Sequence, residues 1–141
     1  SVSGHQGCAA AGDRVMGMLK NCGGAGFVTD GPLRDYAGLV EVGLPAWCTG
    51  LTPASPFTKG PATVGLPINI GGQKIESGDV IVADRDGVVV VPHSKIDFVI
   101  NRLSQVADLE YSLDAEVREG LKIPDPVKEM ILDDNVKFVD D

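Results

Sequence analysis

The first half of the chain alternates between helical and strand-like apolar patterns. In chain order the pattern predicts a helix over 9–22, a buried strand over 25–30, a short helix over 34–43 and a second strand over 44–50. This alternation is typical of a parallel α/β layer. The first helix is predicted from four apolar residues at helical spacing, namely Val15, Met18, Leu19 and Cys22.

The segment 66–92 has β-type patterning throughout, after a loop over 51–65 that is rich in Pro, Thr and Gly. The Asp86-Gly87 turn between two apolar runs predicts a hairpin. The run 88–91 is valine at every position and lacks alternation, so we expect that strand to be buried on both faces.

The last third of the chain has helical patterning. A long helix is predicted over 94–120, with Ser94 and Asp97 spaced as in a capping box, and a shorter helix opens near Pro126. The tail 136–141 has no clear partner within so small a domain. We therefore expect the C-terminal segment to pack on a neighbouring subunit.

A chain of 141 residues suffices for one domain with a real core. We expect a single domain over 1–141, in which 94–141 is a helical C-terminal extension. The opening "SVSGHQG" has no Met and resembles the end of a strand that runs into a loop, so we expect the natural protein to continue upstream.

Charge and composition narrow the class of partner. The formal net charge is -8 and no Lys/Arg cluster occurs, which argues against nucleic acid. No apolar stretch approaches the length that spans a bilayer, so no membrane partner is expected. An odd cysteine count without metal-type spacing favours a reduced, cytoplasmic setting. The cysteines, expected to be small buried apolar residues, are Cys8, Cys22 and Cys48.

Arg34 and Asp35 stand side by side after the strand predicted over 25–30 and a Gly-Pro turn. One interpretation is structural: Asp35 lies in the first turn of a helix, where a carboxylate is favourable, and Arg34 is its solvated partner. The other is functional, because ligands of α/β sheets bind beyond the carboxyl ends of the strands. Arg can hold a carboxylate bidentately, and Asp can hold Mg²⁺ or Mn²⁺.

The motif "GDRV" at 12–15 is a second candidate site. Gly12 and Asp13 open the first helix, whose N-terminal amides form a ready anion site, although Asp13 could equally be an ordinary cap. The two histidines, His5 and His93, are expected in surface loops. Three further aspartates are better explained as turn residues than as metal ligands: Asp79, Asp84 and Asp86.

The ordered motifs "GDRV", "GAGFVTDGPLRD", "LPAWCTG" and "PINIGGQKIESGDVIVADRDGVVVVP" resemble the RraA-like family from about Gly12 to Pro92. Its members include 4-hydroxy-4-methyl-2-oxoglutarate / 4-carboxy-4-hydroxy-2-oxoadipate aldolases and the regulator of ribonuclease activity A. The resemblance implies an α/β fold of the swivelling β/β/α type. It also implies a homotrimer, or a homohexamer built from two trimers, with active sites at the subunit interfaces.

The resemblance also implies site residues. Gly12, Asp13, Arg14 and Val15 match the residues that bind a pyruvyl group in the aldolases, partly through backbone amides. Arg34 matches the arginine that contacts substrate, and Asp35 matches the aspartate that carries the divalent metal. Two positions depart from the aldolase pattern: Gly38 replaces a frequent acidic residue, and Arg14 replaces an aliphatic one. The upstream portion that supplies acidic residues to a neighbouring site is also absent.

Two functions follow as hypotheses. The first is a divalent-metal-dependent lyase that cleaves a C–C bond of a small oxo-acid to give pyruvate, as an aldolase or an oxaloacetate decarboxylase. In it, the metal polarises the keto oxygen and Arg34 shares the enolate charge. The second is a non-catalytic RraA-like protein that binds and regulates a partner such as an RNA-degrading enzyme, for which Gly38 and the acidic surface leave room.

Overall fold

The computed structural model describes residues 1–56, 59–133, 135–137 and 139. It forms two compact units, Ser1–Ile96 and Asp97–Asp141. The tail 136–141, for which packing on a neighbouring subunit is predicted, lies partly outside the described residues. Within the described residues no helix is long and apolar enough to cross a membrane.

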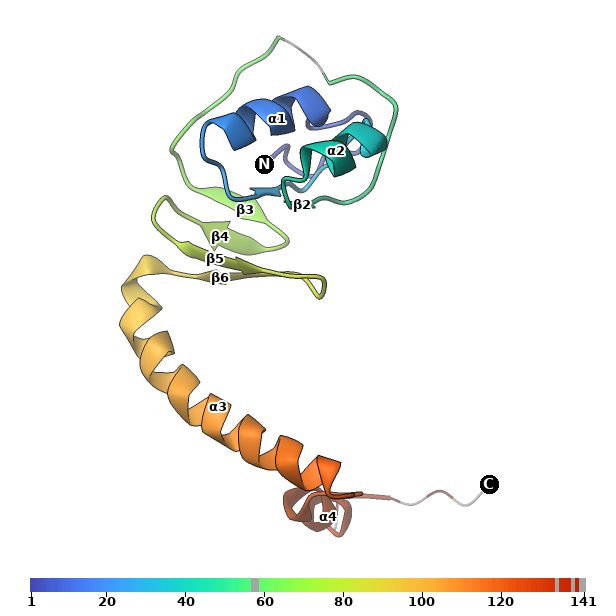
Figure 1. Cartoon of the computed structure of the whole chain (residues 1–141), viewed down its shortest axis with the longest axis vertical. Coiled ribbons are helices and arrows are strands. Elements are labelled where there is room, and N and C mark those ends of the chain that lie inside the picture. Colours follow the sequence, from blue (N-terminus) through green and yellow to red (C-terminus); the bar gives the residue numbers. More distant parts are fainter. Residues whose placement is uncertain (57–58, 134, 138, 140–141) are drawn as a thin grey trace. The chain divides into compact units, whose positions relative to one another are not determined.

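The unit Ser1–Ile96 is built in three layers, helices, a parallel strand pair and two hairpins, as Figure 1 shows. Helices α1 (Asp13–Asn21) and α2 (Tyr36–Val42) pack side by side, and strands β1 (Phe27–Val28) and β2 (Ala46–Trp47) pair in parallel. The predicted α/β alternation and the β/β/α layering are confirmed, although each element is shorter than its predicted range.

The parallel layer extends beyond the two short strands. Phe27 lies opposite Ala46 in the β1–β2 pair, and two isolated parallel bridges, Ala11 to Leu33 and Leu33 to Leu51, continue the pairing toward the next loops. The three segments that contain Ala11, Leu33 and Leu51 therefore run in the same direction and end at the same edge of the layer.

The hairpin layer consists of two antiparallel pairs: β3 (Ile68–Ile70) with β4 (Gln73–Ile75), and β5 (Val80–Ala83) with β6 (Val88–Val91). Gly71 and Gly72 have positive φ angles of 59° and 79°, as the tight two-residue turn between β3 and β4 requires. The hairpin predicted around Asp86-Gly87 is confirmed. Val89 is 60% exposed, so the expectation that β6 is buried on both faces is wrong, since β6 pairs with β5 alone.

The core of this unit lies between α1, α2 and the parallel layer. Met16 and Leu33 are its largest buried side chains, each 1% exposed. Two residues of the predicted apolar pattern of the first helix, Val15 and Met18, are instead exposed, at 45% and 60%. The helix begins at Asp13, and its inward face is set by Met16 with the partly buried Leu19.

Two further expectations from the sequence are wrong. Cys22 and Cys48 are exposed, because one lies at the end of α1 and the other follows the short strand β2. Ser94 is not a helix cap, since a 3-10 turn (His93–Lys95) precedes the long helix. The N–H of His93 at that turn donates instead to Asp79 Oδ1, at 2.9 Å.

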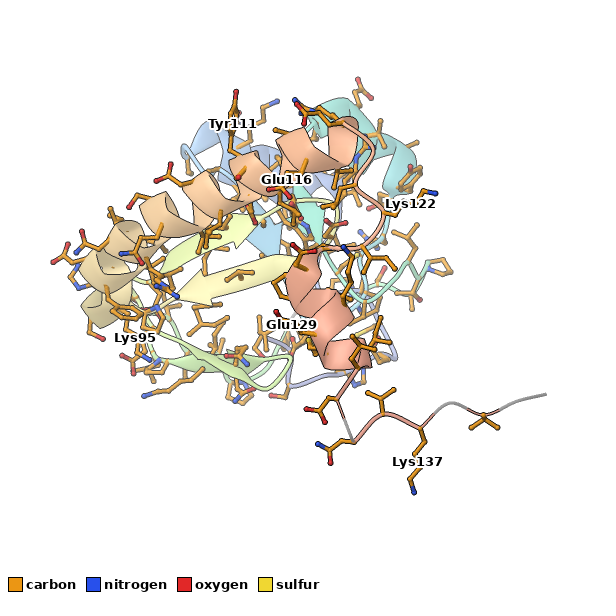
Figure 2. The ribbon with its side chains drawn as sticks, turned by 90° about the horizontal axis from the view of Figure 1, so that it is seen from below. Lys95, Tyr111, Glu116, Lys122, Glu129 and Lys137 are labelled. Atoms are coloured by element: carbon orange, nitrogen blue, oxygen red, sulfur yellow. The ribbon has the colours of Figure 1, made fainter. Side chains whose placement is uncertain are left out.

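The unit Asp97–Asp141 is helical. Helix α3 (Ile96–Arg118) is followed two residues later by Gly120, whose φ of 100° suits the left-handed position after a helix. Helix α4 (Asp125–Ile131) follows Pro124. Figure 2 labels Tyr111 on α3 and Glu129 on α4 among the side chains that project from these helices. Both helices were predicted.

Candidate active site

The site lies where the three parallel segments end. Leu33 is buried between Ala11 and Leu51, and its N–H and carbonyl bond Gly50 and Thr52 at 2.9 Å each. The residues that follow immediately are Gly12 on one segment and Arg34 on the next. The predicted position at the carboxyl edge of a parallel layer, the usual ligand edge of α/β folds, is therefore confirmed.

The backbone of Asp35 is in an uncommon conformation. Its φ and ψ of 62° and 47° are left-handed, a region that non-glycine residues seldom occupy and that concentrates at functional sites. Asp35 precedes α2, and its side chain makes no capping hydrogen bond. Asp35 is the N-cap residue of α2, one position before the first turn in which the structural interpretation places it. The ion pair with Arg34 that this interpretation expects is present.

Gly12 makes the close approach of these elements possible. It is the N-cap of α1, and a Cβ at this position would collide with Asp35 Oδ2 and lie 3.1 Å from Arg34 Cγ and Nε. The carboxylate of Asp35 therefore lies directly over the start of α1. A glycine required by close packing, with no positive φ of its own, marks a tightly fitted contact.

Arg34 is held from two sides. Its Nη1 donates to the Ser55 hydroxyl at 2.5 Å, and its Nε lies 3.1 Å from Asp35 Oδ2. The Nε atom is buried but the angle to Asp35 does not make a hydrogen bond, so its N–H has no acceptor among the described residues. The Asp35 carboxylate balances the charge of Arg34, although this N–H makes no hydrogen bond.

The amides at the start of α1 are only partly free. Arg14 N–H donates to Asp13 Oδ1 at 2.6 Å, and Val15 N–H donates to the Gly12 carbonyl at 3.1 Å. Gly12 N–H and Asp13 N–H donate to no acceptor within the described chain. Of the four residues implied to bind a pyruvyl group, the first two thus offer open amides at the positive end of the helix.

All the candidate residues line one small cavity of about 80 Å³. Its lining includes the segment 10–15 together with Arg34, Asp35 and Pro56. Residues that the sequence placed in two separate motifs thus meet around a single space. A cavity of this size holds only a fragment of a metabolite, since complete ligand pockets are usually about 300 Å³ or more.

No group of three or more His, Cys, Asp or Glu side chains gathers around a possible metal position in the described part of the chain. Asp35 is the one carboxylate of the cavity that is not engaged by a main-chain N–H, because Asp13 Oδ1 accepts from Arg14. Mg²⁺ is commonly bound by one or two carboxylates with several waters, so a single aspartate fits such an ion.

The other candidates have structural partners. Asp79 accepts N–H groups from Glu76 and His93, and these bonds lower the pKa of its carboxyl. Asp84 Oδ1 accepts from Asp86 N–H and Gly87 N–H in the β5–β6 turn. The prediction that Asp79 and Asp84 are turn residues is confirmed. His5 and His93 are exposed outside regular strands and α-helices, as expected.

Sequence reasoning missed two contributors. Ser55 and Pro56 lie in a loop that was predicted only as a Pro-rich connection, and no local pattern distinguishes them. Gly38 has a structural role that its departure from the family pattern does not indicate. In the structure a Cβ there would collide with Asp13 Oδ2, so Gly38 provides the space for that carboxylate.

Comparison with known proteins points to the same family that the sequence motifs resemble. A protein of Halalkalibacterium halodurans named "Putative 4-hydroxy-4-methyl-2-oxoglutarate aldolase" is 42% identical over 94 residues, which is 67% of this chain and 45% of that protein. This chain thus spans less than half of that relative's length.

Solved structures share the fold. An uncharacterized protein from Pseudomonas syringae pv. tomato matches with a TM-score of 0.78 and 28% identity, over 86% of this chain and 61% of that one. Streptomyces coelicolor RraAS2, titled an unusual member of the RNase ES inhibitor RraA protein family, matches with a TM-score of 0.67 and 35% identity, over 79% and 56%. The family model RraA-like (Aldolase/RraA) matches residues 1–90. The chain belongs to the RraA-like family.

Proposed function

We propose that this chain carries the active site of a divalent-metal-dependent lyase that cleaves a C–C bond of an oxo-acid and releases pyruvate. The candidate reactions are the 4-hydroxy-4-methyl-2-oxoglutarate aldol cleavage and oxaloacetate decarboxylation. The observation that carries the proposal is the carboxylate of Asp35, which is held in a left-handed backbone conformation against Gly12 and beside Arg34. A relative's name as an aldolase supports it.

Asp35 would hold the cation, Mg²⁺ or Mn²⁺, with waters completing the coordination. When bound, the cation supplies Lewis-acid polarisation of the substrate's keto oxygen. The side chain suits this role because it makes no capping bond and lines the cavity. Its neighbour Arg34 keeps the local charge balanced before the cation arrives.

The remaining residues bind and orient the pyruvyl end. The open amides of Gly12 and Asp13 receive the substrate carboxylate at the positive end of α1. The guanidinium of Arg34, which lines the cavity, donates to the oxygen on which negative charge develops as the C–C bond breaks. Ser55 keeps the Arg34 guanidinium in place through its hydroxyl.

The test is pyruvate release by the full-length protein from oxaloacetate and from 4-hydroxy-4-methyl-2-oxoglutarate. It is run with Mg²⁺, with Mn²⁺ and with EDTA. We expect release with either metal, none above background with EDTA, and a loss of about 100-fold or more in Asp35→Asn. Asparagine also tolerates the left-handed conformation, so the variant should fold. Equal release by wild type and Asp35→Asn would contradict the proposal.

A second candidate function is regulation of a partner without catalysis. It is favoured by the likeness to the Streptomyces protein titled as a member of an RNase ES inhibitor family. The net charge of -8 suits a basic partner surface. The discriminating result is binding to an RNA-degrading enzyme by a protein that releases no pyruvate under any metal.

We also propose a homotrimer or homohexamer with interfacial sites. The support is the position of the cavity, whose Asp35 side chain is 41% exposed and can be covered by a neighbouring copy. Light scattering after gel filtration gives the mass directly. A monomer at micromolar concentration would contradict this part of the proposal.

A further inference from the structure

The apolar residues of α3 repeat with a seven-residue period. They lie alternately three and four residues apart and form a stripe, the α3 seam, that consists of Ile96, Val99, Leu103, Val106, Leu113 and Val117. Glu110 is the one polar residue at a position of this repeat. A period of 3.5 residues sustained over three heptads is typical of a coiled coil, in which the apolar stripes of two helices interlock.

The α3 seam is exposed along most of its length. Leu103 is 57% and Val117 is 55% exposed, and Val106 and Leu113 between them are exposed as well. Most of the stability of a helix in a protein comes from the packing of its apolar face, so a helix of 23 residues with an open seam is expected to meet a matching surface. The seam lies beyond residues 1–90, which match the family model.

The charged residues beside the seam distinguish the two directions in which α3 could pair with a copy of itself. In a parallel pair, Arg102 faces Ala107 of the second copy and Glu116 faces Leu121 of the second copy, because flanking positions meet five residues apart. Each charge would then lie against an apolar side chain. The parallel arrangement therefore offers no complementary charges at these positions.

The antiparallel arrangement brings opposite charges together. When two α3 helices overlap over their full length, Leu103 faces Leu113 of the second copy, and Arg102 faces Glu116 of the second copy. The two-fold symmetry makes this ion pair twice. Both groups are available, since Arg102 bonds only Gln105 of its own helix, and Glu116, labelled in Figure 2, forms no ion pair within the described residues.

We infer that α3 binds the α3 of a second copy of this chain as an antiparallel two-helix coiled coil, with its two-fold axis near Asp108. Glu110 then lies against Val106 of the second copy, and a polar residue at one seam position fixes the register at a cost in stability. The inference does not depend on the proposed lyase activity. Because the contact is two-fold, it is also separate from any three-fold contact of the proposed trimer.

The first test is the mass of the full-length protein, measured by light scattering after gel filtration. Leu103→Glu places a charge in the seam, so its assembly should have half the mass of wild type, whatever other contacts the subunits make. The matched control is Tyr111→Glu, which replaces an 80% exposed apolar side chain outside the seam and should keep the wild-type mass. Equal masses for wild type and Leu103→Glu would overturn the inference. Circular dichroism checks that both variants are folded.

A charge exchange tests the direction of the pair without altering the seam. In Arg102→Glu the two ion pairs become repulsive, and we expect the Kd of the two-fold contact to rise about 10-fold. The double variant Arg102→Glu with Glu116→Arg should return to the wild-type Kd. A double variant as weak as Arg102→Glu alone would overturn the antiparallel arrangement.

Crosslinking tests the register. In a background with serine at the three native cysteines, Leu109→Cys and Leu103→Cys are each treated with a short bis-maleimide. Leu109 meets Leu109 of the second copy near the two-fold axis, whereas the two copies of Leu103 lie ten residues apart along the pair, about 15 Å. We expect covalent dimers with Leu109→Cys alone. Dimers with Leu103→Cys alone would indicate a parallel pair, and dimers with neither variant would indicate no pair; either result would overturn the inference.

Discussion

Asp79 in the hairpin layer and Asp35 in the α/β layer are both solvent-accessible aspartates near the end of an element, yet their carboxylates meet different groups. Asp79 accepts two main-chain N–H groups, at 2.9 Å each, that tie the loop before β5 to the turn after β6. Asp35 accepts no main-chain N–H in the described chain and lies beside Arg34 over Gly12. A carboxylate saturated by backbone donors stabilises the chain, whereas one without them keeps its lone pairs for a ligand.

Asp30 shows that the layer does not decide the role. It belongs to the α/β layer, but its carboxylate accepts the N–H groups of Val2 and Gly4 and the Ser1 hydroxyl, at 2.6, 2.8 and 2.7 Å. Burial alone raises the pKa of this carboxyl, but the hydrogen bonds outweigh it and the pKa is lowered. Asp30 therefore resembles Asp79 in function, and the local donors distinguish both from Asp35.

Among the changes that leave Arg34 and Asp35 in place, Gly12→Ala should produce the largest effect, because it alters the point where the two motifs meet. The added Cβ collides with Asp35 Oδ2 and displaces the Arg34 side chain. We expect kcat/KM for pyruvate release to fall about 100-fold, as for an ångström-scale misplacement, and stability to fall about 1–3 kcal/mol. Steady-state kinetics and urea unfolding measure the two effects.

The control is Gly17→Ala, one helical turn further along α1. There the new Cβ lies 3.9 Å from Val42 Cγ2, an ordinary contact. We expect a gain of about 0.5 kcal/mol from helix propensity, with activity retained. If both variants lost activity alike, the fitted contact at Gly12 would not be the cause.

Asp30→Asn tests whether a carboxylate that accepts main-chain N–H groups contributes to stability and not to activity. We expect a loss of about 1 kcal/mol in the free energy of unfolding, because the charge-assisted bonds to Val2, Gly4 and Ser1 weaken. Pyruvate release and metal affinity per folded molecule should stay at wild-type values. Asp86→Asn, in the β5–β6 turn, is the control for a generic loss of one negative charge.

The lowered pKa of the Asp30 carboxyl also predicts that the free energy of unfolding depends on pH. The pKa of Asp30 is lower in the folded protein than in the unfolded chain, where it is about 3.9. Its stabilising contribution is therefore complete above that unfolded value and is lost as the pH falls through the folded pKa. The difference in stability between wild type and Asp30→Asn should shrink in this acidic window. A difference that grows as the pH falls would contradict the assignment.

Ser55→Ala should have a moderate effect on catalysis alone. It removes the hydroxyl that accepts from Arg34 Nη1, so Arg34 samples more orientations. We expect kcat/KM to fall about 3- to 10-fold, as for one ordinary hydrogen bond. Unfolding should be unchanged, since Ser55 is exposed. Ser77→Ala in the β4–β5 turn is the control. An equal loss of kcat/KM in that variant would show that Ser55 has no specific role in the site.

Asp79→Asn should have the smallest effect. Its N–H donors from Glu76 and His93 keep the pKa of this exposed carboxyl below its ordinary value. The stability that it adds is present above the unfolded pKa of about 3.9 and disappears as the pH falls through the folded value. We expect a slightly lower Tm at pH 7, and no difference from wild type once the wild-type Asp79 carboxyl is protonated in both the folded and the unfolded protein. Activity should not change.

The sequence predicted the features that depend on local chemistry. The Asp86-Gly87 and Gly71-Gly72 turns, the parallel pairing and the carboxyl-edge position of Arg34 follow from turn residues and hydrophobic period. The buried face of α1 did not follow, because Val15 and Met18 lie at the same helical spacing as the true inward residues, Met16 and Leu19.

The fine geometry of the site depends on contacts between distant segments. The left-handed backbone of Asp35, its approach to Gly12 and the bond from Arg34 to Ser55 join residues up to 23 positions apart. No period or local motif encodes such contacts. The motifs indicated candidate residues for the chemistry, whereas the distinction between Asp35 and the turn aspartates required the hydrogen bonds themselves.

The most direct test of this distinction is a Mn²⁺ titration followed by electron paramagnetic resonance on wild type, Asp35→Asn and Asp79→Asn. The account predicts that wild type and Asp79→Asn bind Mn²⁺ with the same affinity and that Asp35→Asn loses binding while remaining folded by circular dichroism. Equal Mn²⁺ affinity in all three proteins, or a loss confined to Asp79→Asn, would contradict the assignment of Asp35 as the ligand-binding aspartate.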